Sequence, residues 1–417
     1  MPAFNFPVTA PGLPEFEPAI AVNLLNPAIM IAVAVDTNNP GNTPQTGVYR
    51  SVDGGANWTT IHILPLPAPF TSAEAPFVAY AFPNTFYVTA HAFDTTSDGT
   101  CIVYKSTNNG TDFDPPVIVN RGYGSYINND ETLVTVDNGQ SSPYFGNVYV
   151  SYNHQFNVQN NGNSTAFVNR SNNGGTTWDQ PDLLSSESTR VERPDVTVNL
   201  VGQVYGAWIT NAPTTNFIVR RSDDGGTTYN QQVIVSPVVL VPTVLPVPNY
   251  AFRVLTFANI ATDNSVGPFT NRVYAVWQDF QLGYSDIFMS ISNDRGQSWS
   301  VPVSITNATP GSQNFFPAID VDPLLGVVNV IYYSNQLNGF DLDVFVARSI
   351  NGGATFTNSR VTTTSFSPNG SSPTPVPIIG DYIDIISVPP GGYIGIWTDL
   401  RNGSLQIYCG YNTDPVT

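Results

Sequence analysis

The chain has 417 residues and a formal net charge of −17 at pH 7, with only 14 basic residues. Such a chain cannot neutralise a phosphate backbone over an extended surface, which argues against a nucleic-acid partner. Its 12% aromatic content argues against a disordered acidic tail. Its most apolar windows are too short or too rich in proline to form a membrane-spanning helix. The composition is typical of a folded β protein with polar turns.

The N-terminal segment, "MPAFNFPVTAPG", contains one short strand, "FNFPVTA", and has neither the basic nor the hydrophobic part of a secretory signal peptide. Further along the chain, strands with alternating apolar residues recur in groups. The first strand of each group begins near residue 17, 74, 131, 193, 257, 316 or 381. This recurrence predicts seven similar units.

A more specific repeat of eight residues lies near the end of the first six units. Its copies are "SVDGGANW" (51–58), "STNNGTDF" (106–113), "SNNGGTTW" (171–178), "SDDGGTTY" (222–229), "SNDRGQSW" (292–299) and "SINGGATF" (349–356). A strand precedes each copy and another follows it. Asp or Asn at the third position can bind backbone N–H groups, and glycine supplies positive φ, so each copy is predicted to form a hairpin turn.

The seventh unit, from residue 381, stops after three strands, so we expect the N-terminal strand within residues 1–10 to supply its fourth. We therefore predict an all-β chain that folds over residues 1–417 as a single seven-bladed β-propeller. A six-bladed propeller is the alternative, because there are six turn repeats. Cys101 and Cys409 fall in blades two and seven, and no disulfide is expected between them.

The repeated pattern S-x-D-x-G-x-x-W resembles the Asp-box (BNR repeat) of the sialidase-like propellers, and the resemblance covers the whole chain. It implies a propeller whose boxes lie on the face away from the active site. Sialidases, other glycoside hydrolases and propellers that only bind or assemble share this repeat. For a sialidase, the resemblance implies three arginines for the substrate carboxylate, a tyrosine nucleophile activated by a glutamate, and an aspartic acid/base. The early "RIP" motif of that family is absent.

The predicted site lies on the face opposite the boxes, where the first strands begin around the central channel. Alignment of the seven units places these residues at equivalent positions: Glu17, Glu74, Glu131, Arg193, Phe257, Phe316 and Asp381. Crowded carboxyl groups raise one another's pKa, as in glycosidases, or attract a hard cation such as Ca²⁺. Alternatively, they bind backbone N–H groups or water at the channel rim. No other cofactor is indicated.

Tyr382, beside Asp381, is placed to act as a sialidase-like nucleophile with Glu131 as its partner, and a structural tyrosine is the alternative. Together with Arg193, two arginines are candidates for a substrate carboxylate, namely Arg253 and Arg401. Two acids in loops between second and third strands, Asp279 and Asp399, are further ligand-binding candidates. Their alternative role is to stabilise those turns.

Three long proline-rich loops, at 63–76, 236–252 and 365–379, are predicted to rise on the same face. They could form the walls of a groove for an extended ligand or an apolar contact with a protein partner. The sequence therefore predicts a glycan-recognising propeller that acts extracellularly or on a surface. A glycoside hydrolase of exo-sialidase type and a structural component of a surface layer or fibre are the alternatives, so the sequence leaves open whether the chain is an enzyme.

Overall fold

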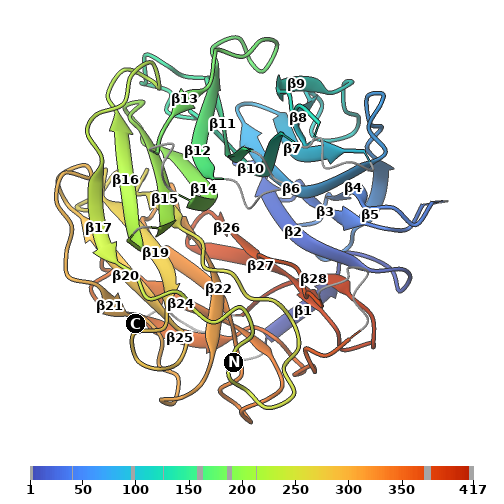
Figure 1. The fold of residues 1–417 in the computed structure, drawn as a ribbon, viewed down its shortest axis with the longest axis vertical. Coiled ribbons are helices and arrows are strands. Elements are labelled where there is room, and N and C mark those ends of the chain that lie inside the picture. Colours follow the sequence, from blue (N-terminus) through green and yellow to red (C-terminus); the bar gives the residue numbers. More distant parts are fainter. Residues whose placement is uncertain are drawn as a thin grey trace.

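The structure, a computed structural model, describes residues 3–39, 41–94, 99–124, 126–156, 163–185, 190–212, 214–370 and 377–412. Within these residues, 28 β-strands form seven four-stranded antiparallel sheets. The sheets are arranged as blades around a central channel (Figure 1). The predicted seven-bladed propeller is confirmed, and the six-bladed alternative is wrong.

Each blade uses four strands that are almost consecutive in the chain. Blade one consists of β2 (Glu15–Val22), β3 (Met30–Asp36), β4 (Gln45–Ser51) and β5 (Thr59–Ile63). Blade two consists of β6 (Ser72–Ala81), β7 (Thr85–Phe93), β8 (Thr100–Ser106) and β9 (Val117–Asn120). Blade three consists of β10 (Ile127–Val136), β11 (Val148–Phe156), β12 (Ser164–Ser171) and β13 (Asp182–Leu183). Blade four consists of β14 (Arg190–Val198), β15 (Val204–Ala212), β16 (Asn216–Ser222) and β17 (Val233–Pro237).

Blades five to seven complete the ring. Blade five consists of β18 (Asn259–Thr262), β19 (Val273–Asp279), β20 (Asp286–Ser292) and β21 (Val303–Ser304). Blade six consists of β22 (Asn314–Val321), β23 (Val328–Ser334), β24 (Asp343–Ser349) and β25 (Thr357–Arg360). Blade seven consists of β26 (Asp384–Val388), β27 (Gly392–Asp399), β28 (Gln406–Asn412) and the N-terminal strand β1 (Ala3–Pro7). The predicted closure of the last blade by the N-terminal strand is therefore confirmed, with Ala3 opposite Asn412.

The six eight-residue repeats form the turns between third and fourth strands, as predicted. In the first of them, the Ser51 hydroxyl donates to Asp53 Oδ1 at 2.8 Å and accepts from the Gly55 N–H at 2.9 Å. Asp53 Oδ1 also accepts from the Asn57 N–H at 2.9 Å. Gly54 and Gly55 have φ of 75° and 88°, which only glycine adopts easily. The repeated acid therefore holds the turn together.

The hydrophobic core lies between neighbouring blades. In one cluster, Tyr87 and Val103 of blade two pack against Val150 and Tyr152 of blade three. Second strands are covered on both faces, and all seven residues of β19 are buried. Each blade thus needs its neighbours to bury its apolar side chains, so the ring is built as one packed body.

Five of the first strands contain a β-bulge at the same level of the channel. At each bulge one residue has positive φ: Glu17 (56°), Ala75 (48°), Glu131 (56°), Arg193 (31°) and Phe316 (51°). Residues other than glycine rarely adopt this conformation, and a bulge changes the direction in which a side chain points. The bulges therefore set which side chains reach the channel.

Candidate functional site

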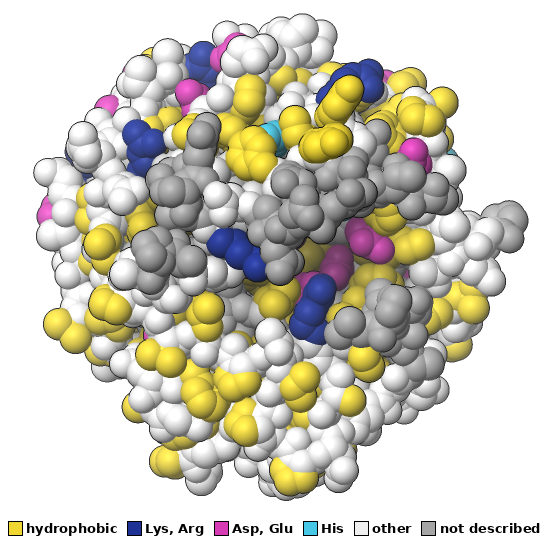
Figure 2. Space-filling view, viewed as in Figure 1, with side chains coloured by type: hydrophobic (Ala, Val, Ile, Leu, Met, Phe, Trp, Pro, Cys, Tyr) yellow, Lys and Arg dark blue, Asp and Glu magenta, His cyan; other side chains and the backbone are white. Residues whose placement is uncertain are grey.

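The predicted site lies at the mouth of the channel, on the face opposite the eight-residue turns. Figure 2 shows this face, with acidic and basic side chains gathered at a central hollow. Six carboxyl groups from blades one, two, three, four and seven interact electrostatically there: Glu17, Glu74, Asp130, Glu131, Glu192 and Asp381. We refer to these six residues as the acidic cluster. The structure thus brings together all four acids that the ring alignment predicted.

The alignment was wrong by one residue in blade two. Glu74 pairs with His91 just before the bulge, and Ala75 is the bulged residue with positive φ. Ala75 is therefore the equivalent of Glu17, whereas Glu74 is the equivalent of Asp130, which also pairs just before a bulge. The extra residue of the bulge cannot be recognised from strand alternation, so the sequence alignment missed it.

Glu17 is the most buried residue of the acidic cluster, with 7% of its surface exposed. Burial raises its pKa well above the usual range, and the charges of Asp381 and Glu74 raise it further. Burial likewise raises the pKa of Glu74. The raised pKa favours the protonated form of Glu17, which is the form in which a carboxyl group can act as a general acid.

Glu131 is held in place from two sides. Its Oε2 accepts from Asn153 Nδ2 at 2.8 Å and from the backbone N–H of Arg193 at 2.5 Å. Burial raises its pKa well above the usual range, and the charges of Glu192 and Asp130 contribute in the same direction. These bonds make Glu131 a link between blades three and four.

Asp130, which the sequence analysis did not assign to the site, forms an ion pair with His91. His91 Nδ1 lies 3.0 Å from Asp130 Oδ1, and His91 Nε2 lies 2.9 Å from Asn128 Oδ1. Burial by itself would raise the pKa of Asp130, but the charge and hydrogen bond of His91 hold it below its ordinary value. Asp130 is therefore ionised. The acid directly before Glu131 in "NNDE" was the available signal.

Arg253 forms a two-point ion pair with Asp381. Its Nε donates to Asp381 Oδ1 at 3.2 Å, and its Nη2 contacts Oδ2. Burial raises the pKa of Asp381 in spite of this partner. Arg253 lies in the long loop between β17 and β18, which brings its guanidinium group from blade five to an acid of blade seven. The charge of Arg253 is thus committed to a protein carboxylate.

Arg193 and Tyr382 meet inside the channel. The guanidinium carbon of Arg193 lies 4.4 Å from the centre of the Tyr382 ring and 5.5 Å from that of Phe257. The Tyr382 hydroxyl donates to the Pro76 carbonyl at 2.7 Å, and burial raises its pKa well above the usual range. A buried phenol that keeps its proton is a poor nucleophile. The groups acting on its pKa are chiefly Glu17 and Arg193, rather than the predicted partner Glu131.

Three other candidates bond to groups of the protein, and the two aspartates among them stabilise turns, which was their alternative role; their predicted ligand binding remains a prediction. Asp279 Oδ2 accepts from the Trp277 indole at 3.0 Å, and Asp399 Oδ2 accepts from the Trp397 indole at 2.8 Å. Arg401 donates to both carboxylate oxygens of Asp399, at 3.0 and 2.6 Å. Each aspartate is 1% exposed. Asp279 also accepts from the Val239 N–H, and Arg401 also donates to Thr363 and Asn5, so Asp279 and Arg401 connect their loops to neighbouring segments.

The structure supports neither a metal site nor a disulfide. Within the described ranges, no three Asp, Glu, His or Cys side chains are arranged to hold a metal ion; a hard cation such as Ca²⁺, one of the alternatives drawn from the sequence, stays a prediction. Cys101 and Cys409 are separate buried thiols. Among the described residues there is also no helix with the length and apolar character needed to cross a bilayer.

The proline-rich loops offer less exposed apolar surface than the sequence predicted. In the loop at 236–252, most large side chains join the core that blades six and seven share, including Leu245, Tyr250 and Phe252. Val239 and Val244 remain about half exposed, at 48% and 45%. Residues 371–376 of the third loop lie outside the described residues. A protein partner at these loops remains a prediction.

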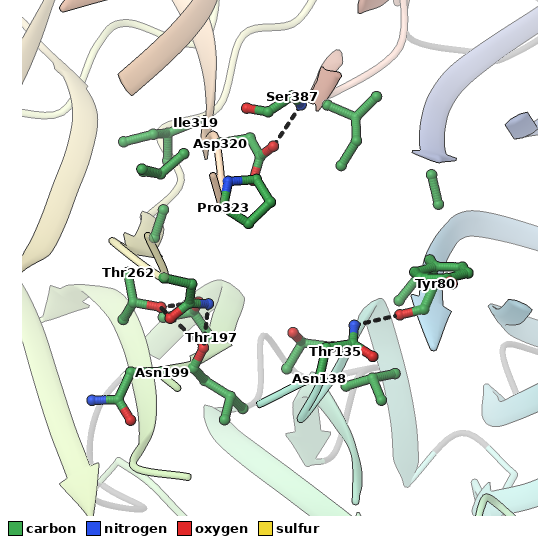
Figure 3. A pocket seen from close by; sticks show the side chains of 18 of the residues that line it. Tyr80, Thr135, Asn138, Thr197, Asn199, Thr262, Ile319, Asp320, Pro323 and Ser387 are labelled. Carbon is green, nitrogen blue, oxygen red and sulfur yellow. Dashed lines mark hydrogen bonds between the residues drawn. The ribbon is translucent and has the colours of Figure 1, made fainter. Parts of the chain in front are cut away.

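The opposite end of the channel opens into a cavity of about 870 Å³ (Figure 3). Several of its polar side chains bond to other groups of the protein. The Asp320 carboxylate accepts from the Ser387 N–H at 2.6 Å, Asn138 donates to the Tyr80 carbonyl at 2.8 Å, and Thr262 donates to the Val198 carbonyl at 3.0 Å. Each of these bonds joins two neighbouring blades, so we assign these side chains a structural role.

No family model and no curated protein matches the sequence. Solved structures do match. An α-L-arabinanase from Penicillium chrysogenum in complex with arabinobiose is 15% identical, with a TM-score of 0.54 over 82% of this chain and 97% of that one. A GH93 α-L-arabinofuranosidase of Fusarium graminearum, also with arabinobiose, is 11% identical, with a TM-score of 0.53 over 83% and 92%. A Dyadobacter fermentans protein of unknown function is 14% identical, with a TM-score of 0.50 over 80% and 94%. At these identities the likeness concerns architecture, and it places the chain among the β-propellers.

Proposed function

We propose that the chain is a glycoside hydrolase that acts at the acidic cluster. The observation that carries the proposal is that two carboxyl groups of one cluster have pKa values shifted in opposite directions. Burial raises the pKa of Glu17 and favours its protonated form, whereas His91 lowers the pKa of Asp130 and favours its ionised form. A protonated and an ionised carboxyl group at one site are the pair that glycosidic bond hydrolysis requires.

In the proposed reaction, Glu17 donates its proton to the glycosidic oxygen as the bond from that oxygen to the anomeric carbon breaks. The ionised Asp130 stabilises the positive charge that develops on the sugar ring, either as a nucleophile or as the base that activates water. Water supplies the hydroxyl group of the product, and its remaining proton returns to a carboxylate. Asp381, fixed by Arg253, stands beside this pair as a further negative charge.

The comparisons suggest which substrates to test first. Two of the similar propellers were solved with arabinobiose, so arabinan and arabino-oligosaccharides are the first candidates. The eight-residue turns match the Asp-box pattern, which supports a place among sialidase-like propellers and keeps sialylated glycans on the panel. An extracellular or surface location suits such polymers and forms part of the proposal.

The test is incubation of the purified protein with arabinan, arabinobiose, sialylated glycans and neutral glycans, with all species followed by mass spectrometry. We expect release of a sugar product that is lost in Glu17→Gln and in Asp130→Asn. Asp294→Asn, in a turn on the opposite face, serves as the matched control and should retain full activity. Cleavage that survives in both cluster variants would contradict the proposal. Binding without cleavage by the unmodified protein would make it a glycan-binding propeller instead.

A further inference from the structure

Two large aromatic side chains are exposed on a turn that leads into the acidic cluster. Tyr123 is 71% exposed and Tyr126 is 64% exposed. Both lie between β9 and β10, in a connection between blades two and three that runs over the face bearing the cluster. Most of the chain's large aromatic residues are buried in the core, so this exposed pair needs an explanation.

The described residues on either side of position 125 in this turn are held by hydrogen bonds, although the two tyrosine rings are exposed. The Tyr126 N–H donates to the Tyr123 carbonyl at 3.0 Å, and the Tyr123 N–H donates to the Ile127 carbonyl at 3.0 Å. The Gly122 N–H donates to Thr100 Oγ1 at 3.0 Å, which ties the turn to blade two. A Cβ atom at Gly122 would lie 2.3 Å from the Gly99 carbonyl oxygen, so the packing there requires glycine. Because the backbone on both sides is already held in place, binding a ligand at the two rings would lose little backbone conformational entropy.

Strand β10 connects the turn directly to the acidic cluster. Tyr126 precedes Asp130 by four residues, which corresponds to about 13 Å along an extended strand. Between them, Asn128 contacts His91 at 2.9 Å, and His91 contacts Asp130 at 3.0 Å. The two tyrosines thus lie outside the cluster, in the turn that leads into the strand bearing Asp130 and Glu131, within the reach of a short oligosaccharide.

We propose that Tyr123 and Tyr126 form an aromatic platform that binds sugar units of a glycan chain beyond the acidic cluster. An aromatic face packs against the C–H groups of a sugar ring, while the phenolic hydroxyl can bond the sugar's hydroxyl groups. The inference rests on the proposed function and narrows it. The substrate is an oligosaccharide or polysaccharide that extends from the cluster across this turn, rather than a single sugar on a small leaving group.

The experiment compares long and short ligands in Tyr123→Ala/Tyr126→Ala and in the matched Tyr123→Phe/Tyr126→Phe protein. Binding to arabinan and the other polysaccharides of the panel is measured by affinity gel electrophoresis, and KM and kcat are measured on arabinan and arabinobiose. The alanine pair should weaken binding to the polymer about tenfold, since a buried aromatic contact contributes on the order of 1 kcal/mol or more. It should raise KM for the polymer while kcat and the kinetics on the disaccharide stay the same. The phenylalanine pair should retain binding.

Phe145→Ala, an exposed aromatic residue on the opposite face (47% exposed), is the control and should change nothing. Unchanged polymer binding in the alanine pair, with hydrolysis intact, would overturn the platform and leave the proposed function standing. If the unmodified protein binds the polymer without ever hydrolysing it, and the alanine pair loses that binding, the two results together would support the platform and overturn the hydrolase. A protein that neither binds nor cleaves any member of the panel would overturn both.

Discussion

Asp384 joins the last blade to the first through a buried carboxyl group, and we expect it to make the protein less stable as the pH rises. Its Oδ2 accepts from the Ile20 N–H of blade one at 2.9 Å, and its Oδ1 accepts from the Ile385 N–H at 2.8 Å. Burial raises its pKa from 3.8 to about 7, although these two bonds lower it. The folded protein therefore retains a proton that the unfolded chain releases.

The sign and size of the effect follow from this difference. Because the folded state binds the proton more tightly, the contribution of Asp384 to stability is fully present below about pH 3.8 and is lost as the pH rises to about 7. Each pH unit between these values costs about 1.4 kcal/mol of unfolding free energy, or about 4 kcal/mol over the window. Asp195 and Asp320, with pKa raised to about 6 by burial, act in the same direction.

Chemical denaturation of the native protein and of Asp384→Asn at pH 4.5, 5.5, 6.5 and 7.5 tests this reasoning. The variant has no titrating group at this position, so its unfolding free energy should fall less steeply with pH than that of the native protein. The two slopes should differ by about 1.4 kcal/mol per pH unit, whatever the absolute stability of the variant. Asp294→Asn is the control. Asp294 has its pKa lowered to about 2, chiefly by hydrogen bonds from Ser298 that outweigh burial, so its titration lies below the measured window. Equal slopes for Asp384→Asn and the native protein would refute the argument.

Three further substitutions test individual contacts. Ser222→Ala removes the hydroxyl that accepts from the buried Gly226 N–H at 2.8 Å. It should lower the unfolding free energy, measured in denaturant titrations, by about 1–3 kcal/mol. No change would mean that water replaces the hydroxyl. Arg193→Met removes the cation 4.4 Å from the Tyr382 ring and should cost about 2 kcal/mol, seen as a lower Tm, whereas an unchanged Tm would show that packing alone holds the channel. Arg253→Met leaves Asp381 without its partner, so the pKa of that carboxyl should rise further. Because the Arg253 side chain is 38% exposed and its charge is partly screened by solvent, stability at pH 8 should fall by roughly 1–2 kcal/mol, less than for a fully buried pair; a smaller loss at pH 8 than at pH 5 would contradict this.

The sequence predicted the ring because six of its turns share the same pattern of hydrogen-bonding side chains and glycines. Ser51, Asp53 and Gly55 each make a bond that the turn requires, and the five other copies preserve the pattern. The missing fourth strand of the last unit then pointed to "FNFPVTA". Local chemistry of this kind can be recognised without coordinates, since every bond lies within a few residues.

The candidate site was only partly predictable, because its contacts join residues far apart in the chain. Glu17 and Glu131 were found from their place in the repeat. The bulge that moves Glu74 out of the aligned position adds one residue without changing the apolar pattern. Arg253 belongs to a long connection between blades that lies outside the repeated strands and turns, so nothing in the repeat predicts that it contacts Asp381, 128 residues later.

The strand that closes the ring also sets the order in which the protein can be completed. Ala3 pairs with Asn412, 409 residues further along the chain. On a ribosome that adds about 5–20 residues per second, the first strand waits roughly 20–80 s for its partner to be made. During that time the first six blades can form in sequence, while β28, the strand with which β1 pairs, has yet to be made. The last blade can therefore be completed only once β28 has been synthesised, and the N-terminal strand lacks its partner until then.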